Sequence, residues 1–137
     1  MRKRLRRAAG FSLVEVLISM VILSFALLGT AALTANGLKS TNDSSYRSQA
    51  TFLADDILDR MRANISKARG GQYNIDASGN LTAGPGTLEY FDGKEWLASL
   101  KDALPGGKGT VKVAAGVATI AITWDGGATA FTTKSQL

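Results

Sequence analysis

Two residue types on which much protein chemistry depends are absent from the sequence. Its 137 residues include no cysteine and no histidine. Without cysteine there is no disulfide, thiolate metal site or thiol nucleophile, and without histidine the commonest general base and metal ligand is missing. The serines and lysines show no spacing that indicates a Ser–Lys dyad. We therefore expect a protein that is not an enzyme and that holds no metal ion and no cofactor.

Negative charge is absent from the first ten residues, where five positive charges gather. The formal net charge is +5, so the chain from residue 11 onward carries as many acidic as basic side chains. Basic runs occur in nucleic-acid-binding proteins, but this one directly precedes an apolar segment, and we interpret it as a topology signal. Because the remainder is neutral, no direct nucleic-acid binding is predicted. The basic residues are Arg2, Lys3, Arg4, Arg6 and Arg7.

Charge of either sign is missing from residues 16–38, between Glu15 and Lys39. As a helix this segment is ~34 Å long, which is enough to cross a hydrocarbon core of about 30 Å. The positive-inside rule keeps residues 1–10 in the cytoplasm and exports the rest of the chain. A cleaved secretory signal has a shorter apolar core, and Gly29-Thr30-Ala31 is only a weak cleavage site. We therefore expect a membrane anchor.

A short motif joins the basic run to the apolar segment. Residues 9–15 read Ala-Gly-Phe-Ser-Leu-Val-Glu. This pattern resembles the class III signal of type IV pilins and pseudopilins, in which a basic leader ends in Gly and the mature chain begins with Phe or Met. The resemblance implies that prepilin peptidase cuts between Gly10 and Phe11 and methylates the Phe11 amine. It also implies that Glu15, the fifth mature residue, attracts the terminal amine of a neighbouring subunit during filament assembly.

Elementary chemistry is compatible with these implied roles. Gly10 has no side chain, so a membrane protease can approach its backbone closely. A carboxylate at membrane depth is unfavourable without a partner, and the Phe11 amine is a cation at the same depth. A second interpretation of Glu15 stays open, in which it only reaches the headgroups and stabilises the start of its helix.

Apolar residues return at helical spacing after the polar segment 39–49, and together they predict one long helix from Phe11 to Arg69 that ends at Gly70-Gly71. We expect any bend at Asn36-Gly37 or within Thr41–Ser45. Charged residues occupy the other side, and we interpret them as a solvated face and not as a cation site. The apolar residues are Ala50, Leu53, Ala54, Ile57, Leu58, Met61 and Ile65; the charged ones are Asp55, Asp56, Asp59, Arg60 and Arg62.

Two further segments narrow the resemblance. Residues 47–50 read Arg-Ser-Gln-Ala and residues 59–64 read Asp-Arg-Met-Arg-Ala-Asn. They resemble the PilV-type minor pilins, the type IV pilus modification group. Residues 103–109 and the pair Trp124-Asp125 are similar to the same group. The resemblance implies contacts with other minor pilins, the major pilin and the pilus assembly platform.

The rest of the chain predicts a small α+β body. Residues 70–90 have loop composition, and Asp92 is expected to cap a helix that runs to Leu104. Three strands are predicted at 110–114, 117–124 and 128–133, joined by tight turns. The expected fold is therefore α+β, with a long N-terminal helix packed on a small antiparallel sheet. The predicted parts are a leader (1–10), a transmembrane half-helix (11–38), an exported amphipathic half-helix (39–69) and a globular head (70–137).

The sequence thus predicts a minor type IV pilin of the bacterial inner membrane, with its N-terminus in the cytoplasm and its head in the periplasm. A minor pseudopilin of type II secretion is the first alternative, and a membrane-anchored periplasmic binding domain that never polymerises is the second. The chain lacks the C-terminal cysteine pair of many major pilins, which argues against a bulk subunit. It also lacks proline in the apolar helix, where Gly29 could serve as the bending point. A place at the tip or along the shaft stays open.

Overall fold

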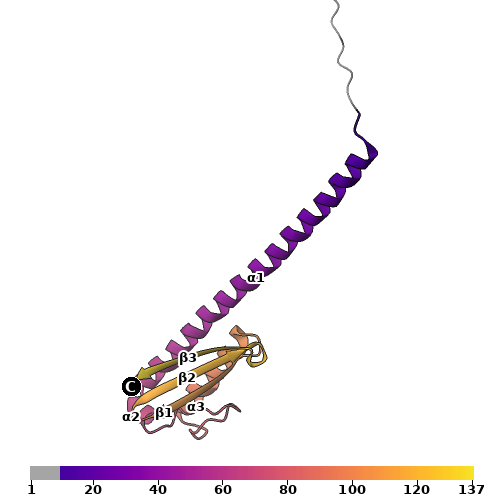
Figure 1. Ribbon diagram of the computed structural model, residues 1–137. Coiled ribbons are helices and arrows are strands. Elements are labelled where there is room, and N and C mark those ends of the chain that lie inside the picture. The colour runs from indigo at the N-terminus through magenta and orange to yellow at the C-terminus, as the bar shows by residue number, and fades with distance from the viewer. Residues whose placement is uncertain (1–9) are drawn as a thin grey trace, which may run out of the picture. The chain divides into compact units, whose positions relative to one another are not determined.

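The computed structural model of the chain describes residues 10–137 (Figure 1). Positions 1–9, which hold nearly all of the predicted leader, lie outside the described residues. The chain divides into two compact units, which we call the N-terminal unit (up to Thr41) and the C-terminal unit (Asn42–Leu137). In chain order the elements are α1 (Leu13–Ala63), α2 (Ile65–Arg69), α3 (Leu88–Ala103), β1 (Lys108–Ala114), β2 (Val117–Trp124), η1 (Asp125–Gly127) and β3 (Thr129–Gln136).

Helix α1 runs without interruption through both positions where a bend was expected. Several of its hydroxyl side chains bond to backbone carbonyls one turn earlier, as in Ser24 Oγ to the Met20 oxygen (2.7 Å) and Thr34 Oγ1 to the Thr30 oxygen (2.9 Å). These hydroxyls are therefore satisfied within the helix and need no water. The helical run breaks at Asn64, ahead of α2, and it ends at Gly70 as predicted.

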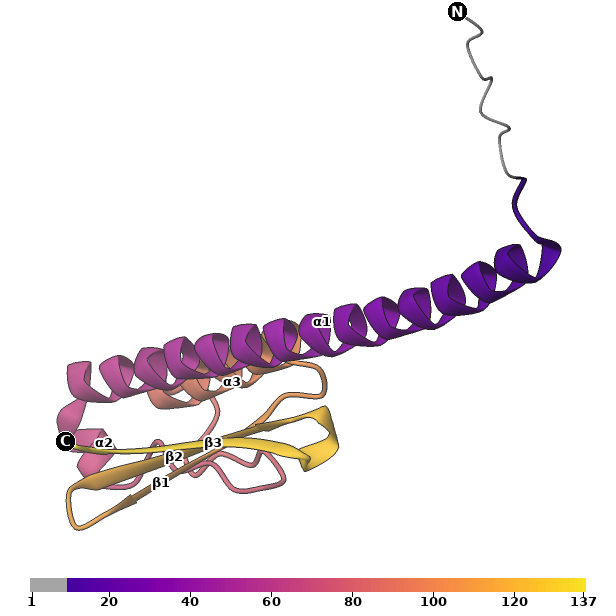
Figure 2. The ribbon, with the colours of Figure 1, turned by 45° about the horizontal axis from the view of Figure 1, so that its top comes forward.

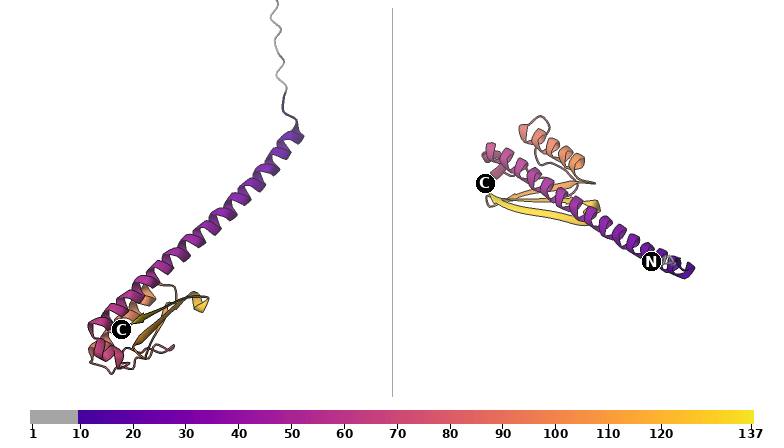
Figure 3. Two further views of the ribbon diagram at one scale, coloured as in Figure 1. Left: turned by 60° about the vertical axis from the view of Figure 1, so that its left-hand side comes forward. Right: turned by 90° about the horizontal axis from the view of Figure 1, so that it is seen from above.

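The three strands form one antiparallel sheet in the order β1-β2-β3. Val111 of β1 and Thr133 of β3 both stand opposite Ile120 of β2, which makes β2 the central strand. Ala115 (φ 49°) and Gly116 (φ 76°) join β1 to β2 with positive φ at both central residues, as a tight hairpin turn requires. Figures 2 and 3 show α3 beside the C-terminal part of α1, with the sheet as a second layer.

The core of the C-terminal unit lies between these two layers. Alternate residues of β2 point into it, while α1 and α3 each contribute one face. Each fully buried large side chain stabilises the fold by about 1.5–3 kcal/mol. Buried core residues include Ala50, Ala54, Ile57, Leu58 and Met61 from α1, Trp96 and Leu100 from α3, and Ala118, Ile120, Ile122 and Trp124 from β2.

Trp96 connects all three parts of this core. Its ring is fully buried, and its Nε1 donates a hydrogen bond to the Leu53 carbonyl oxygen of α1 (2.7 Å). On the sheet side its ring lies against Gly109 of β1, where an added Cβ would come within 2.3 Å of the ring. Glycine at this position therefore lets α3 approach the sheet closely.

The predicted fold class is confirmed: a long N-terminal apolar helix is followed by a small three-stranded antiparallel sheet. This α+β layout matches the type IV pilin fold. The start of α3 was predicted wrongly. Thr87, not Asp92, is the capping residue, because its extended backbone lets Oγ1 accept a hydrogen bond from the Tyr90 N–H (3.3 Å). Asp92 lies one turn inside the helix and binds side chains of neighbouring segments instead.

Candidate processing and assembly site

The bond between Gly10 and Phe11 lies just ahead of α1, in backbone that is not helical. Both residues are exposed; the Phe11 side chain is 84% accessible, and nothing lies within 4 Å of an added Cβ at Gly10. A peptidase needs the scissile backbone free of internal hydrogen bonds and open to approach. Among the described residues, neither Gly10 nor Phe11 takes part in a backbone hydrogen bond, which is compatible with the predicted cleavage.

Glu15 lies in the first turn of α1. The Ser12 carbonyl oxygen accepts from the Glu15 N–H (3.0 Å) and from the Val16 N–H (3.2 Å), and this starts the helix. The positive end of the helix dipole favours a carboxylate at this place. Within the described residues, no hydrogen bond or ion pair involves the Glu15 carboxylate, and the residue is exposed. Its charge is thus available to a group from another molecule.

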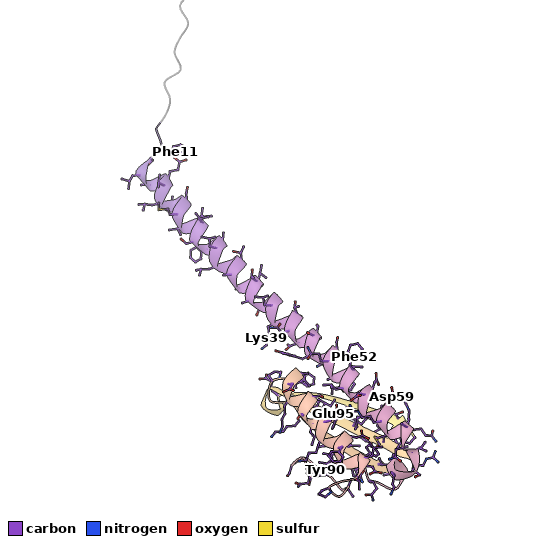
Figure 4. The ribbon with its side chains drawn as sticks, turned by 180° about the vertical axis from the view of Figure 1, so that it is seen from behind. Phe11, Lys39, Phe52, Asp59, Tyr90 and Glu95 are labelled. Carbon is purple, nitrogen blue, oxygen red and sulfur yellow. The ribbon has the colours of Figure 1, made fainter. Side chains whose placement is uncertain are left out.

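Phe11 and Glu15 line one shallow groove of about 320 Å³ on the surface of α1, together with Val16, Ser19 and other residues of the same face. Gly10 is not among the lining residues. Figure 4 shows Phe11 at the start of the helix. The N-terminal amine that cleavage would create is therefore carried by a residue that already shares a groove with Glu15.

The side chains that follow form an apolar surface. Helix α1 contains a stretch long and apolar enough to cross a membrane, judged by length and composition. Its large apolar side chains from Val16 to Leu38 are exposed and have no protein core to pack against in the N-terminal unit. A hydrocarbon environment fits such a surface, so the helix is consistent with a membrane anchor.

Residues 5–31 match the prokaryotic N-terminal methylation motif. The methylation motif covers the cleavage site, Glu15 and about the first two thirds of the apolar stretch. It supports a type IV pilin-like protein, of pilin or pseudopilin type, that is processed by prepilin peptidase in the context of filament assembly. No curated protein and no solved structure matches the chain significantly. The methylation motif does not reach the C-terminal unit, so the resemblance to PilV-type proteins stays a prediction.

The charged face of α1 beyond the apolar stretch is only partly solvated, which corrects the sequence-based interpretation. Arg60 bonds to Glu95 of α3 (2.8 Å), Asp92 of α3 (3.3 Å) and Asp56 of α1 (3.2 Å), and its side chain is only 25% exposed. The hydrogen bond to Glu95 is the main cause that raises the pKa of Arg60 above its usual range. Local spacing predicted only the pair with Asp56; the α3 partners are distant in sequence and left no local signal.

Asn64 and Tyr73 extend this polar network. The Asn64 Nδ2 donates to Glu89 Oε1 (3.0 Å), and the Tyr73 hydroxyl donates to Asp92 Oδ2 (2.7 Å). Hydrogen bonds from its own backbone N–H and from Asn64 lower the pKa of Glu89. Burial, with the Asp92 carboxylate as the second cause, raises the pKa of Tyr73 above its usual range. Arg60 and Asn64, both from the Asp-Arg-Met-Arg-Ala-Asn run, thus fasten the end of α1 to α3.

The acidic side chains of α1 are not arranged around a cation. Asp56 is held by Arg60, and Asp59 accepts from Arg62 (2.8 Å). Across residues 10–137, no group of acidic side chains is arranged to hold a metal ion. The polar residues of this face act as connectors between elements, and we find no catalytic geometry among them.

Proposed function

We propose that the chain is a minor type IV pilin of the PilV type, and that its role is assembly and not catalysis. One observation carries the proposal. The cleavable bond just ahead of α1, the first-turn carboxylate and the start of the apolar stretch follow one another in register, within a segment that matches the methylation motif. The α+β layout of the C-terminal unit supports the same conclusion.

In this proposal prepilin peptidase removes residues 1–10 and methylates the Phe11 amine. The new amine is a cation on Phe11, a residue that lines the same groove as Glu15. Attraction between opposite charges is far stronger at low dielectric than in water. Glu15 of one subunit therefore draws the Phe11 amine of its neighbour, and the subunit leaves the bilayer for the growing filament.

The proposed location is the inner membrane of a bacterium. The leader lies in the cytoplasm, residues 11–38 span the bilayer, and the C-terminal unit is in the periplasm until the subunit enters a pilus. The proposed partners are other minor pilins, the major pilin and the assembly platform. The neutral chain beyond the leader supports no role in direct nucleic-acid binding.

The deciding measurement is the intact mass of the protein from membranes of its host. We expect a chain that begins at Phe11 with one added methyl group. A Gly10→Val variant is the matched control and should keep its full length, because a branched side chain blocks the close approach of the peptidase. A wild-type mass that begins at Met1 in cells with active peptidase would contradict the proposal and favour an anchored domain that does not polymerise.

A pseudopilin of type II secretion would be processed in the same way, so a second measurement separates the two. We expect the processed protein in sheared pili, and a deletion strain should change pilus number or composition while secretion stays intact. Loss of secretion with unchanged pili would assign the chain to the secretion system instead.

A further inference from the structure

A second groove, which the proposed function does not use, lies in the C-terminal unit. It has a volume of about 670 Å³ and is bounded by α3, the turn at residues 77–80 and the start of β1. Three lysines line it: Lys94 and Lys101 lie two turns apart on α3, and Lys108 begins β1. Leu97 and Ala98 add an apolar strip between them, and no acidic residue is part of the lining. We call it the lysine groove.

The charge of the lysine groove is not neutralised within the chain. Among the described residues, none of its three lysines forms an ion pair. The Nζ of Lys94 lies 5.7 Å from the centre of the Tyr90 ring. Positive side chains around an apolar strip fit a partner that combines an apolar anchor with carboxylates.

This chain itself presents such a surface on α1. Phe52 is 75% exposed, and Asp55 and Asp59 follow it three and seven residues later on the side of α1 opposite its buried residues. Asp55 has no ion-pair partner among the described residues, and Asp59 pairs only with the exposed Arg62. Figure 4 shows Phe52 and Asp59 along α1, with Glu95 and Tyr90 on α3 beside it. We call Phe52, Asp55 and Asp59 the acidic stripe.

The two surfaces lie at the same level along α1 in the C-terminal unit. Leu53 of α1 bonds to Trp96 of α3, and Arg60 of α1 bonds to Glu95, so the part of α3 that carries the lysine groove runs alongside the part of α1 that carries the acidic stripe. Two copies that stand side by side with parallel α1 axes can therefore bring the groove of one against the stripe of the other without a shift along the axis.

We propose that the lysine groove receives the acidic stripe of a second copy of this chain. Phe52 lies on the apolar strip formed by Leu97 and Ala98. Because α3 runs antiparallel to α1, Asp55 and Asp59, which both follow Phe52, lie on the Lys94 side of the strip. In many interfaces a buried aromatic side chain supplies much of the affinity, and charged pairs at the rim fix how the two partners are aligned. The contact uses different surfaces on the two copies, so each added copy leaves one groove and one stripe free.

The overall charge favours this occupant over a polyanion. The chain from residue 11 onward is neutral, so two copies do not repel each other, and no net positive field draws in a nucleic acid. No aromatic residue lines the groove, so it offers no platform on which bases could stack. The inference does not depend on cleavage or on Glu15.

Cysteine crosslinking tests the contact cleanly because the chain has no cysteine of its own. One tagged full-length copy carries Ala98→Cys in the groove, and a second carries Ser48→Cys, one turn before Phe52. Both are expressed in host cells that lack prepilin peptidase, so the result is independent of processing. After mild oxidation of membranes we expect a disulfide-linked pair of the two tagged chains. Thr132→Cys, on the exposed side of β3, replaces Ser48→Cys in the control and should give about tenfold less crosslinked pair.

Charge reversal then tests the chemistry of the contact. Lys94→Glu in the groove copy should reduce the crosslinked pair about tenfold, and Asp55→Lys with Asp59→Lys in the other copy should restore it. Lys112→Glu is the matched control, outside the groove, and should leave crosslinking unchanged. The proposal is overturned if no pair forms, if the Thr132 control crosslinks equally, or if the second reversal does not restore the pair. Restoration would also show that the reversed chains are folded.

Discussion

The carboxylate of Glu15 has no partner among the described residues, although it lies at the start of the apolar part of α1, which is suited to a membrane. An unpaired charge in such a place is unfavourable, and a partner from outside the chain relieves it. The residue shares a groove with Phe11, whose amine cleavage would expose. The first prediction therefore concerns this single side chain.

Replacing Glu15 with Ala should leave cleavage and methylation intact but reduce the protein in sheared pili about tenfold or more. A tenfold change corresponds to about 1.4 kcal/mol, which is small for a charge pair at membrane depth. Quantitative immunoblots of pili and membranes measure it. Ser19→Ala, in the same groove, is the control, because its hydroxyl bonds only to the Glu15 carbonyl (2.7 Å) and carries no charge. Normal incorporation of the Glu15 variant would remove the assembly role of this residue.

At the scale of elements, the contact between α1 and α3 holds the C-terminal unit together. Apolar packing supplies most of it, and Arg60, whose side chain is mostly buried, adds a polar connection. Arg60 contacts three carboxylates, two of them on α3, whereas the more exposed Arg62 has one ion-pair partner, Asp59 of its own helix, and donates an exposed hydrogen bond to Ser135 Oγ of β3 (3.0 Å). The two arginines, two residues apart, should therefore differ in their effect on stability.

Arg60→Ala should lower the free energy of unfolding by about 1–3 kcal/mol, since it removes three charge-assisted hydrogen bonds, of which the one to Asp92 joins two mostly buried side chains. For a unit of this size that change lowers the Tm by about 5–15 °C. Arg62→Ala should change the free energy of unfolding by less than about 1 kcal/mol, as is usual for exposed pairs. Thermal unfolding of the full chain in detergent, followed by circular dichroism, compares them. Equal destabilisation by the two substitutions would contradict the assigned role of Arg60.

The elements themselves were largely predictable, because periodicity and turn chemistry are local signals. The apolar stripe through Ile57 and Met61 predicted the buried face of α1, and both residues are fully buried. The cap of α3 was misplaced because Asp92 and Thr87 are both acceptable capping residues, and only tertiary contacts with Tyr73 and Arg60 decide what Asp92 does. The Arg60–Glu95 pair spans 35 residues, and no sequence pattern encodes such a distance.

At the scale of the whole molecule, pH acts on the C-terminal unit through its bound carboxylates. The hydrogen bond from Arg60 lowers the pKa of Glu95, and the pKa of Glu89 is also below its usual value. A carboxyl whose pKa is lower in the folded state stabilises the fold above its unfolded pKa, and this contribution is lost as the pH falls through the folded pKa. Tyr73 shifts in the opposite direction, so its contribution is lost only at strongly alkaline pH.

The Tm of the full chain should thus stay nearly constant from about pH 7 to about pH 5 and fall below about pH 4, where free glutamate gains its proton. In the Glu95→Gln variant the acid-induced fall should be shallower, since one of the shifted groups no longer titrates. Lys112→Gln is the control on the surface and should keep the wild-type slope. Identical slopes for Glu95→Gln and wild type would show that acid acts elsewhere in the molecule.

Strand β3 is paired only with β2, and in the part of the chain that the structure describes no strand follows on its outer side. An open edge of this kind can accept a strand from another chain, which is a common route to aggregation. Lys134 is exposed near the end of β3, and a charge there opposes such an addition because the incoming strand would crowd and partly desolvate it. Where many copies of this domain lie close together, Lys134 therefore favours separately folded domains over domains joined edge to edge through their β-sheets.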